Sequence, residues 1–133
     1  MKDKLLKLQS NSYAVYSKFR VSAIVVMKDG KEYRGVNVEN ASYGASICAE
    51  RVAILSAIAD GYKKGDFAEL YVMTDSSNTS TPCFICRQVI SEFFDIDSHV
   101  ICMNKKGESK TYLVSDLCTY PFTDEDLKWK VDL

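Results

Sequence analysis

The chain has 133 residues, of which 47% are hydrophobic and 26% are charged, and its formal net charge is −1. These values are ordinary for a globular protein, and the length predicts one domain spanning residues 1–133. Lysine and arginine are dispersed rather than gathered in a stripe, which argues against a nucleic-acid partner and favours a small uncharged substrate. No apolar signal core or membrane-spanning run is present in the sequence, so we expect no export and no membrane partner.

The first half of the chain predicts a helix, a β-hairpin and a second helix. Apolar residues at helical spacing indicate a first helix from Lys2 to about Tyr16. Two strand patterns, Val21–Met27 and Glu32–Val38, flank an Asp-Gly dipeptide that is typical of tight hairpin turns. The segment Ile47–Ala59 is apolar on most sides, as expected of a buried central helix.

The second half predicts three strands and one helix. A short apolar strand covers Leu70–Met73, and Thr81 followed by Pro82 suggests the N-cap and first position of a third helix. Two further strands are expected at His99–Met103 and Thr111–Val114. The resulting order, α-β-β-α-β-α-β-β, predicts a three-layer α/β/α sandwich with a five-stranded mixed sheet.

Two cysteine clusters carry the chemistry of this chain. Cys48 is followed two residues later by Glu50, and the second cluster places Cys83 and Cys86 in a Pro-Cys-x-x-Cys motif. Structural zinc sites usually have four protein ligands, whereas catalytic sites have three and leave a position open for water. Three thiolates and a nearby carboxylate therefore predict one catalytic zinc ion, with Glu50 as the catalytic acid and base.

The local setting of these cysteines suits negatively charged sulfur. Both clusters begin predicted helices, where free backbone N–H groups and the helix dipole favour thiolates. Arg51 could offset the remaining charge, although a single arginine on a helix is more often a surface residue. Among the other cysteines, Cys102 lies in an apolar stretch and is expected to be buried, whereas Cys118 receives no role. An odd number of cysteines without a disulfide pattern favours a reducing, cytoplasmic compartment.

With these motifs in place, the chain resembles the small homotetrameric cytidine deaminases. The resemblance runs from about residue 13 to residue 127. The segments that carry it are Tyr16-Ser17-Lys18-Phe19-Arg20-Val21, Asp29-Gly30, Gly35-Val36-Asn37-Val38-Glu39-Asn40-Ala41-Ser42-Tyr43, Cys48-Ala49-Glu50-Arg51, Pro82-Cys83-x-x-Cys86-Arg87-Gln88-Val89-Ile90 and Pro121-Phe122. It implies hydrolysis of cytidine and 2′-deoxycytidine to the uridines and ammonia by a zinc-bound hydroxide, in pyrimidine salvage. It also implies a homotetramer whose pockets are shared between subunits.

The resemblance also assigns roles to the metal site. It implies that Cys48, Cys83 and Cys86 bind one Zn²⁺ per subunit and that Glu50 moves the proton. Arg51 would donate hydrogen bonds to the ligand sulfurs and offset their charge.

Five further positions are implied to contact the substrate. Asn37 and Glu39 would hold the ribose 3′-hydroxyl, and their spacing supports this because residues two apart on a strand point to the same side. Phe19 would pack against the pyrimidine ring, and the backbone of Ala49 would bond the edge of the base. Phe122 would reach the pocket of a neighbouring subunit.

The sequence departs from the family pattern at four places. Val15 and Cys118 stand where the family commonly has proline, and Ser22 stands where glycine is common. Phe84-Ile85 fills the interval between the second-cluster cysteines, where small residues are typical, and Phe84 adds bulk beside the metal helix.

Other functions compete with this prediction. A deaminase of the nucleoside antibiotic blasticidin S shares both cysteine motifs, but the Asn-x-Glu pair that ends in Glu39 is typically altered in those enzymes. Polynucleotide deaminases usually use histidine as the first ligand, and His99, the single histidine, lies in a predicted strand far from the motifs. A binding protein that kept zinc but lost catalysis would have no use for Glu50. A redox Cys-x-x-Cys protein would leave the first cluster unexplained.

Overall fold

The computed structural model describes residues 1–130, so the last three positions of the expected domain, 131–133, lie outside the described residues. The elements in chain order are α1 (Lys2–Gln9), β1 (Val21–Met27), β2 (Glu32–Val36), the 3-10 helix η1 (Tyr43–Ala45), α2 (Ala49–Ala59), β3 (Phe67–Thr74), α3 (Phe84–Phe93), β4 (Phe94–Met103), β5 (Ser109–Leu113), α4 (Val114–Leu117) and the 3-10 helix η2 (Asp124–Lys130).

The strands form one five-stranded sheet in the order β2-β1-β3-β4-β5. β3 and β4 are parallel, whereas the other neighbouring strands are antiparallel, so the predicted mixed sheet is confirmed. The parallel pair is joined through α3, as a parallel connection requires a crossover. This crossover places the N-terminus of α3 beyond the carboxyl end of β3, an edge where α/β proteins commonly bind ligands.

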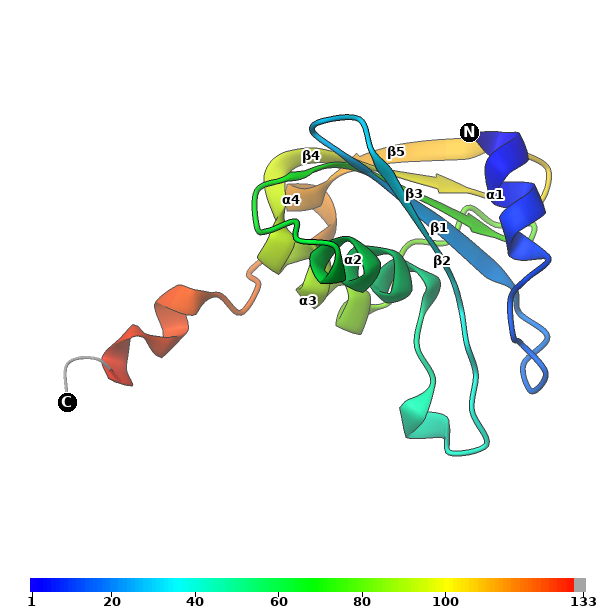
Figure 1. Cartoon of the computed structure of the whole chain (residues 1–133), viewed down its shortest axis with the longest axis horizontal. Helices are drawn as coiled ribbons and strands as arrows, with labels where there is room; N and C mark the ends of the chain where they lie inside the picture. The colour runs from blue at the N-terminus through cyan, green and yellow to red at the C-terminus, as the bar shows by residue number, and fades with distance from the viewer. Residues whose placement is uncertain (131–133) are drawn as a thin grey trace.

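Helices cover both faces of the sheet, which confirms the three-layer sandwich. Figure 1 shows α2 and α3 against one face and α1 against the other. Along β1, Ala23 and Val25 belong to the core beneath α2 and α3, whereas Ile24 packs with Leu5 of α1 on the opposite side. Leu5 is fully buried, and replacing such a side chain with alanine costs roughly 2–5 kcal/mol.

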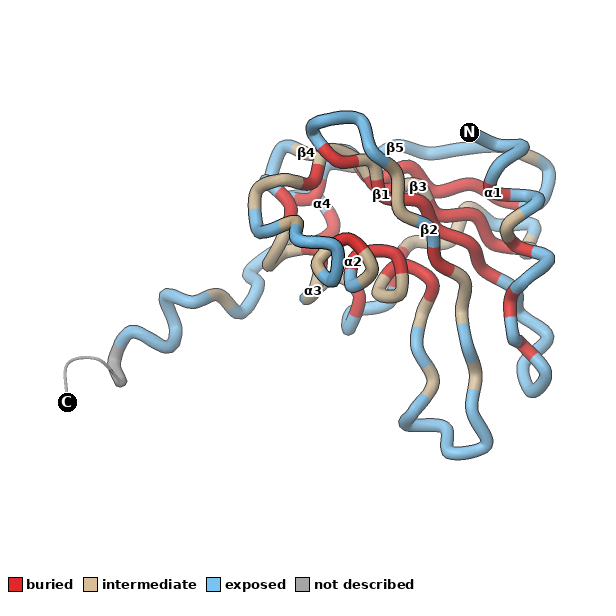
Figure 2. The backbone as a smooth tube through the Cα atoms, in the orientation of Figure 1, coloured by how far each residue is buried: buried red, intermediate tan, exposed pale blue. Residues whose placement is uncertain are grey.

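The core follows the inner surfaces of these layers. In Figure 2 the buried backbone runs along the central strands and the sheet-facing side of α2. Two segments project from this body: the connection between β2 and α2, which contains η1, and the C-terminal segment that ends in η2 (Figure 1). No helix among the described residues is both long and apolar enough to cross a membrane.

The first helix is shorter than the sequence predicts. It ends at Gln9 rather than near Tyr16, and the Ser10 hydroxyl donates to the carbonyl of Lys7 at 2.7 Å. Beyond the helix, Tyr13 forms a β-bridge with Val38. Polar side chains that bond the local backbone compete with helix formation, which explains the early end.

The start of the third helix is also different from the prediction. Thr81 and Pro82 were expected to be its N-cap and first residue, but Cys83 is the N-cap and the helix begins at Phe84. The Thr81 hydroxyl and the Pro82 carbonyl instead accept hydrogen bonds from Arg87.

Strand ends differ as well, and a short helix follows the last strand. The strands β3 and β4 are longer than expected. β2 ends at Val36, and Val38 forms only isolated bridges beyond it. Val114 was expected to end the last strand but begins α4.

Candidate metal centre and substrate cavity

The first cluster sits at the start of α2. Cys48 is the N-cap residue, and Ala49 and Glu50 form the first turn. The helix lies close to β2 because position 35 is glycine: a Cβ atom there would collide with the Ala49 carbonyl and lie 2.5 Å from the Ala53 amide nitrogen. Gly35 therefore allows the helix that carries the first cysteine to pack directly on the sheet.

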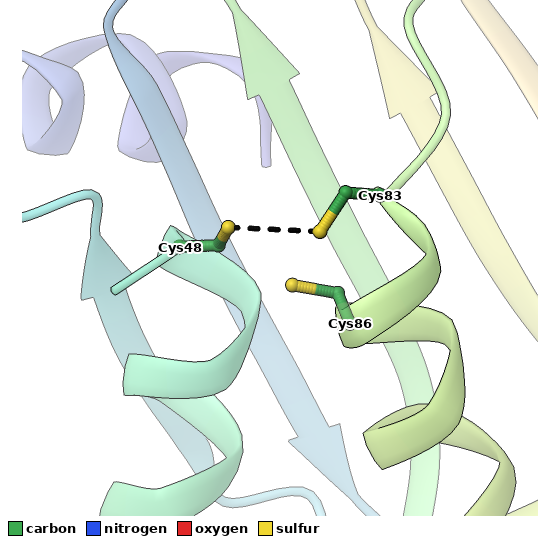
Figure 3. A group of neighbouring side chains, drawn as sticks. All are labelled: Cys48, Cys83 and Cys86. Carbon is green, nitrogen blue, oxygen red and sulfur yellow. Dashed lines mark hydrogen bonds between the residues drawn. The ribbon is translucent and has the colours of Figure 1, made fainter. Parts of the chain in front are cut away.

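The second cluster lies at the start of α3, and the two helix N-termini face each other. Cys83 is the N-cap of α3, and Cys86 lies in the first turn with its side chain buried. The Sγ atoms of Cys48 and Cys83 are 3.8 Å apart, and the three Sγ atoms lie within 4.8 Å of one another. Figure 3 shows the three thiols converging from the two helices.

The arrangement of the thiols fits a zinc ion. Two sulfurs bound tetrahedrally to one zinc, each at about 2.3 Å, lie about 3.8 Å apart. The separation of Cys48 and Cys83 has this value. Three sulfur donors leave the fourth tetrahedral position for water or substrate, as in catalytic zinc sites. The three predicted ligands are thus brought together as a set that could hold Zn²⁺.

The charge of the thiols is shared unevenly in the metal-free chain. The pKa of Cys48 is lowered to about 5, first by hydrogen bonding with the Cys86 thiol and further by Arg51. The pKa of Cys86 is raised, because it keeps the proton that it shares with Cys48 and because it is buried. Cys48 is therefore a thiolate at neutral pH even without a metal.

Arg51 is aimed at this negative charge. Its Nη2 atom donates to the Cys48 sulfur at 3.5 Å. Its Nε atom is buried and has no hydrogen-bond partner among residues 1–130. The attraction between the guanidinium and the thiolate charge offsets the cost of the unpaired N–H. The positive charge of Arg51 in turn favours the anionic form of the cysteine ligands.

Glu50 is a buried carboxylic acid next to the sulfur atoms. Its side chain is only 5% exposed. Burial raises its pKa to about 7, and the negative charge of Cys48 adds to this effect. A carboxyl group whose pKa lies near neutrality can both accept and release a proton, which is the property required of a general acid and base.

A cavity of about 230 Å³ opens beside the cysteines. It brings together six of the predicted site residues, and four of them come from outside the metal ligands. Its lining consists of Phe19, Val21, Asn37, Cys48, Ala49, Glu50, Val72, Thr74, Ser80, Thr81 and Cys83.

Asn37 and Glu39 are placed differently. The Asn37 amide lines the cavity and also holds the backbone, since its oxygen accepts from the Val21 N–H at 2.9 Å and its nitrogen donates to the Phe19 carbonyl at 2.8 Å. Glu39 lines a separate hollow of about 360 Å³. There its carboxylate accepts hydrogen bonds from Ser17, which lower its pKa.

Phe122 lies away from the cavity of its own chain. It is 56% exposed, and its carbonyl accepts a hydrogen bond from Gln88 at 2.7 Å. It lines a hollow of about 220 Å³ between α3 and the C-terminal segment. The expected contact of Phe122 with a second subunit therefore stays a prediction.

Several cavity residues were not singled out from the sequence. Thr74 ends β3, and Ser80 and Thr81 precede the second cysteine cluster. For Ser80 and Thr81, the position just before the Pro82-Cys83 motif was the available signal, whereas Thr74 carried none. Ser12, which donates to the Asn37 side chain, carried no signal because it is distant in the sequence.

Comparison with known proteins places the chain in a family. The family model for the "Cytidine and deoxycytidylate deaminase zinc-binding region" matches residues 1–103. The cytidine deaminase of Halalkalibacterium halodurans is 38% identical over 92% of this chain and 91% of its own length. That of Sporosarcina psychrophila is 37% identical over 95% and 91%. The crystal structure of cytidine deaminase from Burkholderia pseudomallei has a TM-score of 0.86 and 39% identity, covering 90% of this chain and 94% of that one.

The match includes both cysteine clusters and the helices that carry them. The geometry of the three thiols, the buried carboxyl of Glu50 and the fold agree with it. The chain therefore belongs to the cytidine and deoxycytidylate deaminase family.

Proposed function

We propose that the cavity beside the three cysteines catalyses the hydrolytic deamination of cytidine and 2′-deoxycytidine, releasing ammonia and the corresponding uridines. The observation that carries this proposal is the buried Glu50 carboxyl, whose pKa is raised to about 7, at the first turn of the helix capped by Cys48. The similarity to two cytidine deaminases over more than nine-tenths of the chain supports it.

Glu50 is proposed to transfer the protons in this reaction. A zinc ion held by Cys48, Cys83 and Cys86 would lower the pKa of a water molecule and so supply the nucleophile near neutral pH. Glu50 accepts the proton from that water and delivers it to the ring nitrogen of the base. The same carboxylate then takes a second proton, from the hydroxyl added to the base, and delivers it to the amine as it leaves, and burial keeps bulk water from competing for these protons.

Three other cavity residues are proposed to orient the nucleoside. Phe19 is 41% exposed and lines the cavity, so its ring can pack against a planar base. The backbone of Ala49 lies at the start of α2, where N–H groups are free to bond the base edge. Asn37 would present its remaining N–H to the sugar while its other bonds fix its orientation.

Glu39 is proposed to join Asn37 in binding the ribose 3′-hydroxyl. Its carboxylate now accepts from Ser17, and Ser17 in turn accepts from the Phe19 N–H at 3.0 Å. The sugar hydroxyl would replace one of the Ser17 contacts. This requires the segment from Tyr16 to Phe19 to shift when substrate binds.

We further propose that the chain assembles as a homotetramer in which Phe122 completes a neighbouring pocket. The segments that project from the body expose large side chains: Tyr43 is 78% exposed, and Tyr120 has no contact that shields it. Burying these aromatic side chains against a partner subunit would remove apolar surface from water and so stabilise the assembly. Light scattering of the active protein tests this assembly, and an active monomer contradicts it.

The reducing compartment is also part of the proposal. The five cysteines are free thiols, and three of them form the metal set. Such thiols persist where disulfides are rare, which supports a cytoplasmic protein. An enzyme that deaminates free nucleosides there would serve pyrimidine salvage.

A parallel substrate assay tests the function. The purified zinc-loaded protein is offered cytidine, 2′-deoxycytidine, cytosine, CMP and blasticidin S, and ammonia release is measured. We expect activity on the first two compounds only, and E50A prepared in the same way serves as the control for contaminating enzyme. Preference for blasticidin S, or for CMP, would replace the proposed substrate.

A further inference from the structure

Arg87 lies one residue after the buried ligand Cys86 on α3, but its guanidinium forms its hydrogen bonds with groups other than the three ligand sulfur atoms. It is half-buried and does not line the substrate cavity. Its backbone N–H donates to the Cys83 carbonyl at 2.9 Å, as part of the first helical turn. The guanidinium turns back along the chain toward the segment that precedes Cys83.

The guanidinium joins two distant segments through three hydrogen bonds. Nε donates to the Pro82 carbonyl at 2.8 Å, and Nη2 donates to the Thr81 hydroxyl at 2.7 Å. Nη1 donates to the Leu117 carbonyl at 3.3 Å, at the end of α4. The first two acceptors immediately precede the ligand Cys83, and Thr81 is itself a wall of the cavity.

Neighbouring side chains hold the guanidinium in this orientation. The ring of Phe84 lies over it, with 4.3 Å between the guanidinium carbon and the ring centroid. The Cys118 thiol donates to the Arg87 carbonyl at 3.3 Å. Phe84 is 77% exposed, and stacking on the guanidinium covers part of its ring. Phe84 and Cys118 are both departures from the family pattern, and both contact Arg87.

We propose that Arg87 is a positioning residue that fixes the Thr81–Pro82 segment, and thereby sets both the position of Cys83 as a metal ligand and the shape of the cavity wall. Its anchor is the end of α4, which is packed on the sheet through the buried side chains Val114 and Leu117. The guanidinium of Arg87 makes its hydrogen bonds to groups other than the three ligand sulfur atoms, and the residue does not line the substrate cavity. It acts through Thr81 and Pro82.

A lysine cannot replace this arginine. The three acceptors lie along the fork of one planar group, whereas an ammonium on a flexible stem reaches one or two of them and stacks less well on an aromatic ring. Residues that orient metal ligands from outside typically change metal affinity or activity by roughly 10–100-fold when they are replaced. Arg87→Lys should therefore change the site although it keeps the charge.

The test compares R87K with R34K. Arg34 is exposed on β2 and serves as the matched control. Zinc transfer from each loaded protein to a colorimetric chelator is followed in time, together with kcat and KM for cytidine. We expect R87K to release zinc about tenfold faster and to raise KM more than it lowers kcat, whereas R34K matches the wild type. Equal zinc release and KM in the two variants overturn the proposal.

A second variant keeps the test decisive if R87K folds poorly. T81V removes only the hydroxyl that accepts from Nη2, at a side chain that is already partly exposed. We expect faster zinc release in T81V as well, and little further change when T81V is added to R87K, because both remove the same link. Zinc release from T81V at the wild-type rate overturns the proposal, and so do independent, multiplying effects of the two changes where R87K folds. The KM measurement rests on the proposed deaminase function, whereas the zinc measurement does not, so the two can fail separately.

Discussion

The Arg51 guanidinium donates a hydrogen bond to the Cys48 sulfur at 3.5 Å and keeps a second N–H buried without a partner among residues 1–130. Three thiolates on one divalent ion leave the centre with a net negative charge. The nearby cation reduces this charge, and partial burial of the Arg51–Cys48 contact strengthens the interaction. The pKa of Arg51 is itself raised, first by its hydrogen bond to Cys48.

Replacing Arg51 with glutamine should weaken zinc binding. R51Q keeps the approximate size and the hydrogen-bonding ability of the side chain but removes the charge. We expect zinc affinity to fall by roughly 10–100-fold, measured by competition with a chelator of known affinity. R34Q, which removes an exposed arginine from β2, is the control and should leave the affinity unchanged. Equal affinities in R51Q and the wild type would show that Arg51 does not act on the sulfurs.

Replacing Glu50 with glutamine or alanine should separate metal binding from catalysis. Glu50 is buried beside the thiols, but it is not one of the three grouped ligands. We expect E50Q and E50A to retain one zinc per chain and to lose turnover by roughly 10²–10⁴-fold, the usual contribution of a positioned acid and base. Zinc content is measured by atomic absorption and turnover by ammonia release. Near-normal turnover in either variant would remove Glu50 from the proton transfer.

The Glu50 carboxyl should also make the stability of the metal-free protein depend on pH. Burial raises the pKa of Glu50 from 4.5 to about 7, so the folded metal-free chain holds a proton that the unfolded chain has released. Between these two pH values the unfolded chain loses this proton while the folded chain keeps it, so the free energy of unfolding falls as pH rises. We therefore expect metal-free E50Q to gain stability relative to the metal-free wild type as pH rises from about 4.5 to about 7. Urea denaturation at several pH values measures the difference, and a constant difference contradicts the raised pKa.

The metal-free thiols should differ strongly in reactivity. The pKa of Cys48 is lowered to about 5, chiefly by hydrogen bonding with Cys86, whereas burial raises the pKa of Cys102 to about 12. Iodoacetamide reacts with thiolates, so chelator-treated protein at pH 7 should be alkylated at Cys48 and spared at Cys102. The reaction at Cys48 should fall to half near pH 5, and added zinc should protect it. Peptide mapping by mass spectrometry identifies the site; reactivity of Cys48 that rises only above pH 8 contradicts the lowered pKa.

Much of the sheet could be predicted from the sequence because its signals are local. The first strand, Val21–Met27, has the predicted bounds, since apolar β-branched residues precede an Asp-Gly turn. The length of β4 was underestimated, because the first part of the strand, which includes Asp95 and Asp97, is polar and exposed. Those residues become part of a strand through pairing of Phe94 with Phe67 in β3, a contact that no local pattern reveals.

The metal centre was predictable for the same reason, whereas the separate placement of Asn37 and Glu39 was not. Each cysteine cluster marks a helix start, and the parallel crossover brings the two starts together. The rule that residues two apart share a face applies to a continuous strand, but β2 ends at Val36. Beyond it, hydrogen bonds from Ser17 draw Glu39 into a separate hollow while Asn37 stays at the cavity. The proposed role of Arg87 could not be predicted either, because it depends on a hydrogen bond to Leu117, 30 residues away in the sequence.

Gly35 offers a test of how the first cysteine cluster is held, because this residue of β2 lies directly against the backbone at the start of α2. In Gly35→Ala the new Cβ would collide with the Ala49 carbonyl and the Ala53 amide, which are backbone atoms that cannot rotate away. The start of α2 must then move off β2, and Cys48 moves with it. Overpacking of this kind costs roughly 1–3 kcal/mol.

We expect G35A to lower the midpoint of thermal unfolding and to bind zinc more weakly, with both effects measured on the same preparation. Gly44→Ala is the matched control, because a Cβ at position 44 meets nothing within 4 Å. That position lies in η1, within the connection between β2 and α2 that projects from the body (Figure 1). If G35A loses stability but keeps wild-type zinc affinity, the contact supports the fold without setting the position of Cys48. If both properties match those of G44A, α2 can adjust to the added methyl group, and the close packing on β2 is not required for the metal site.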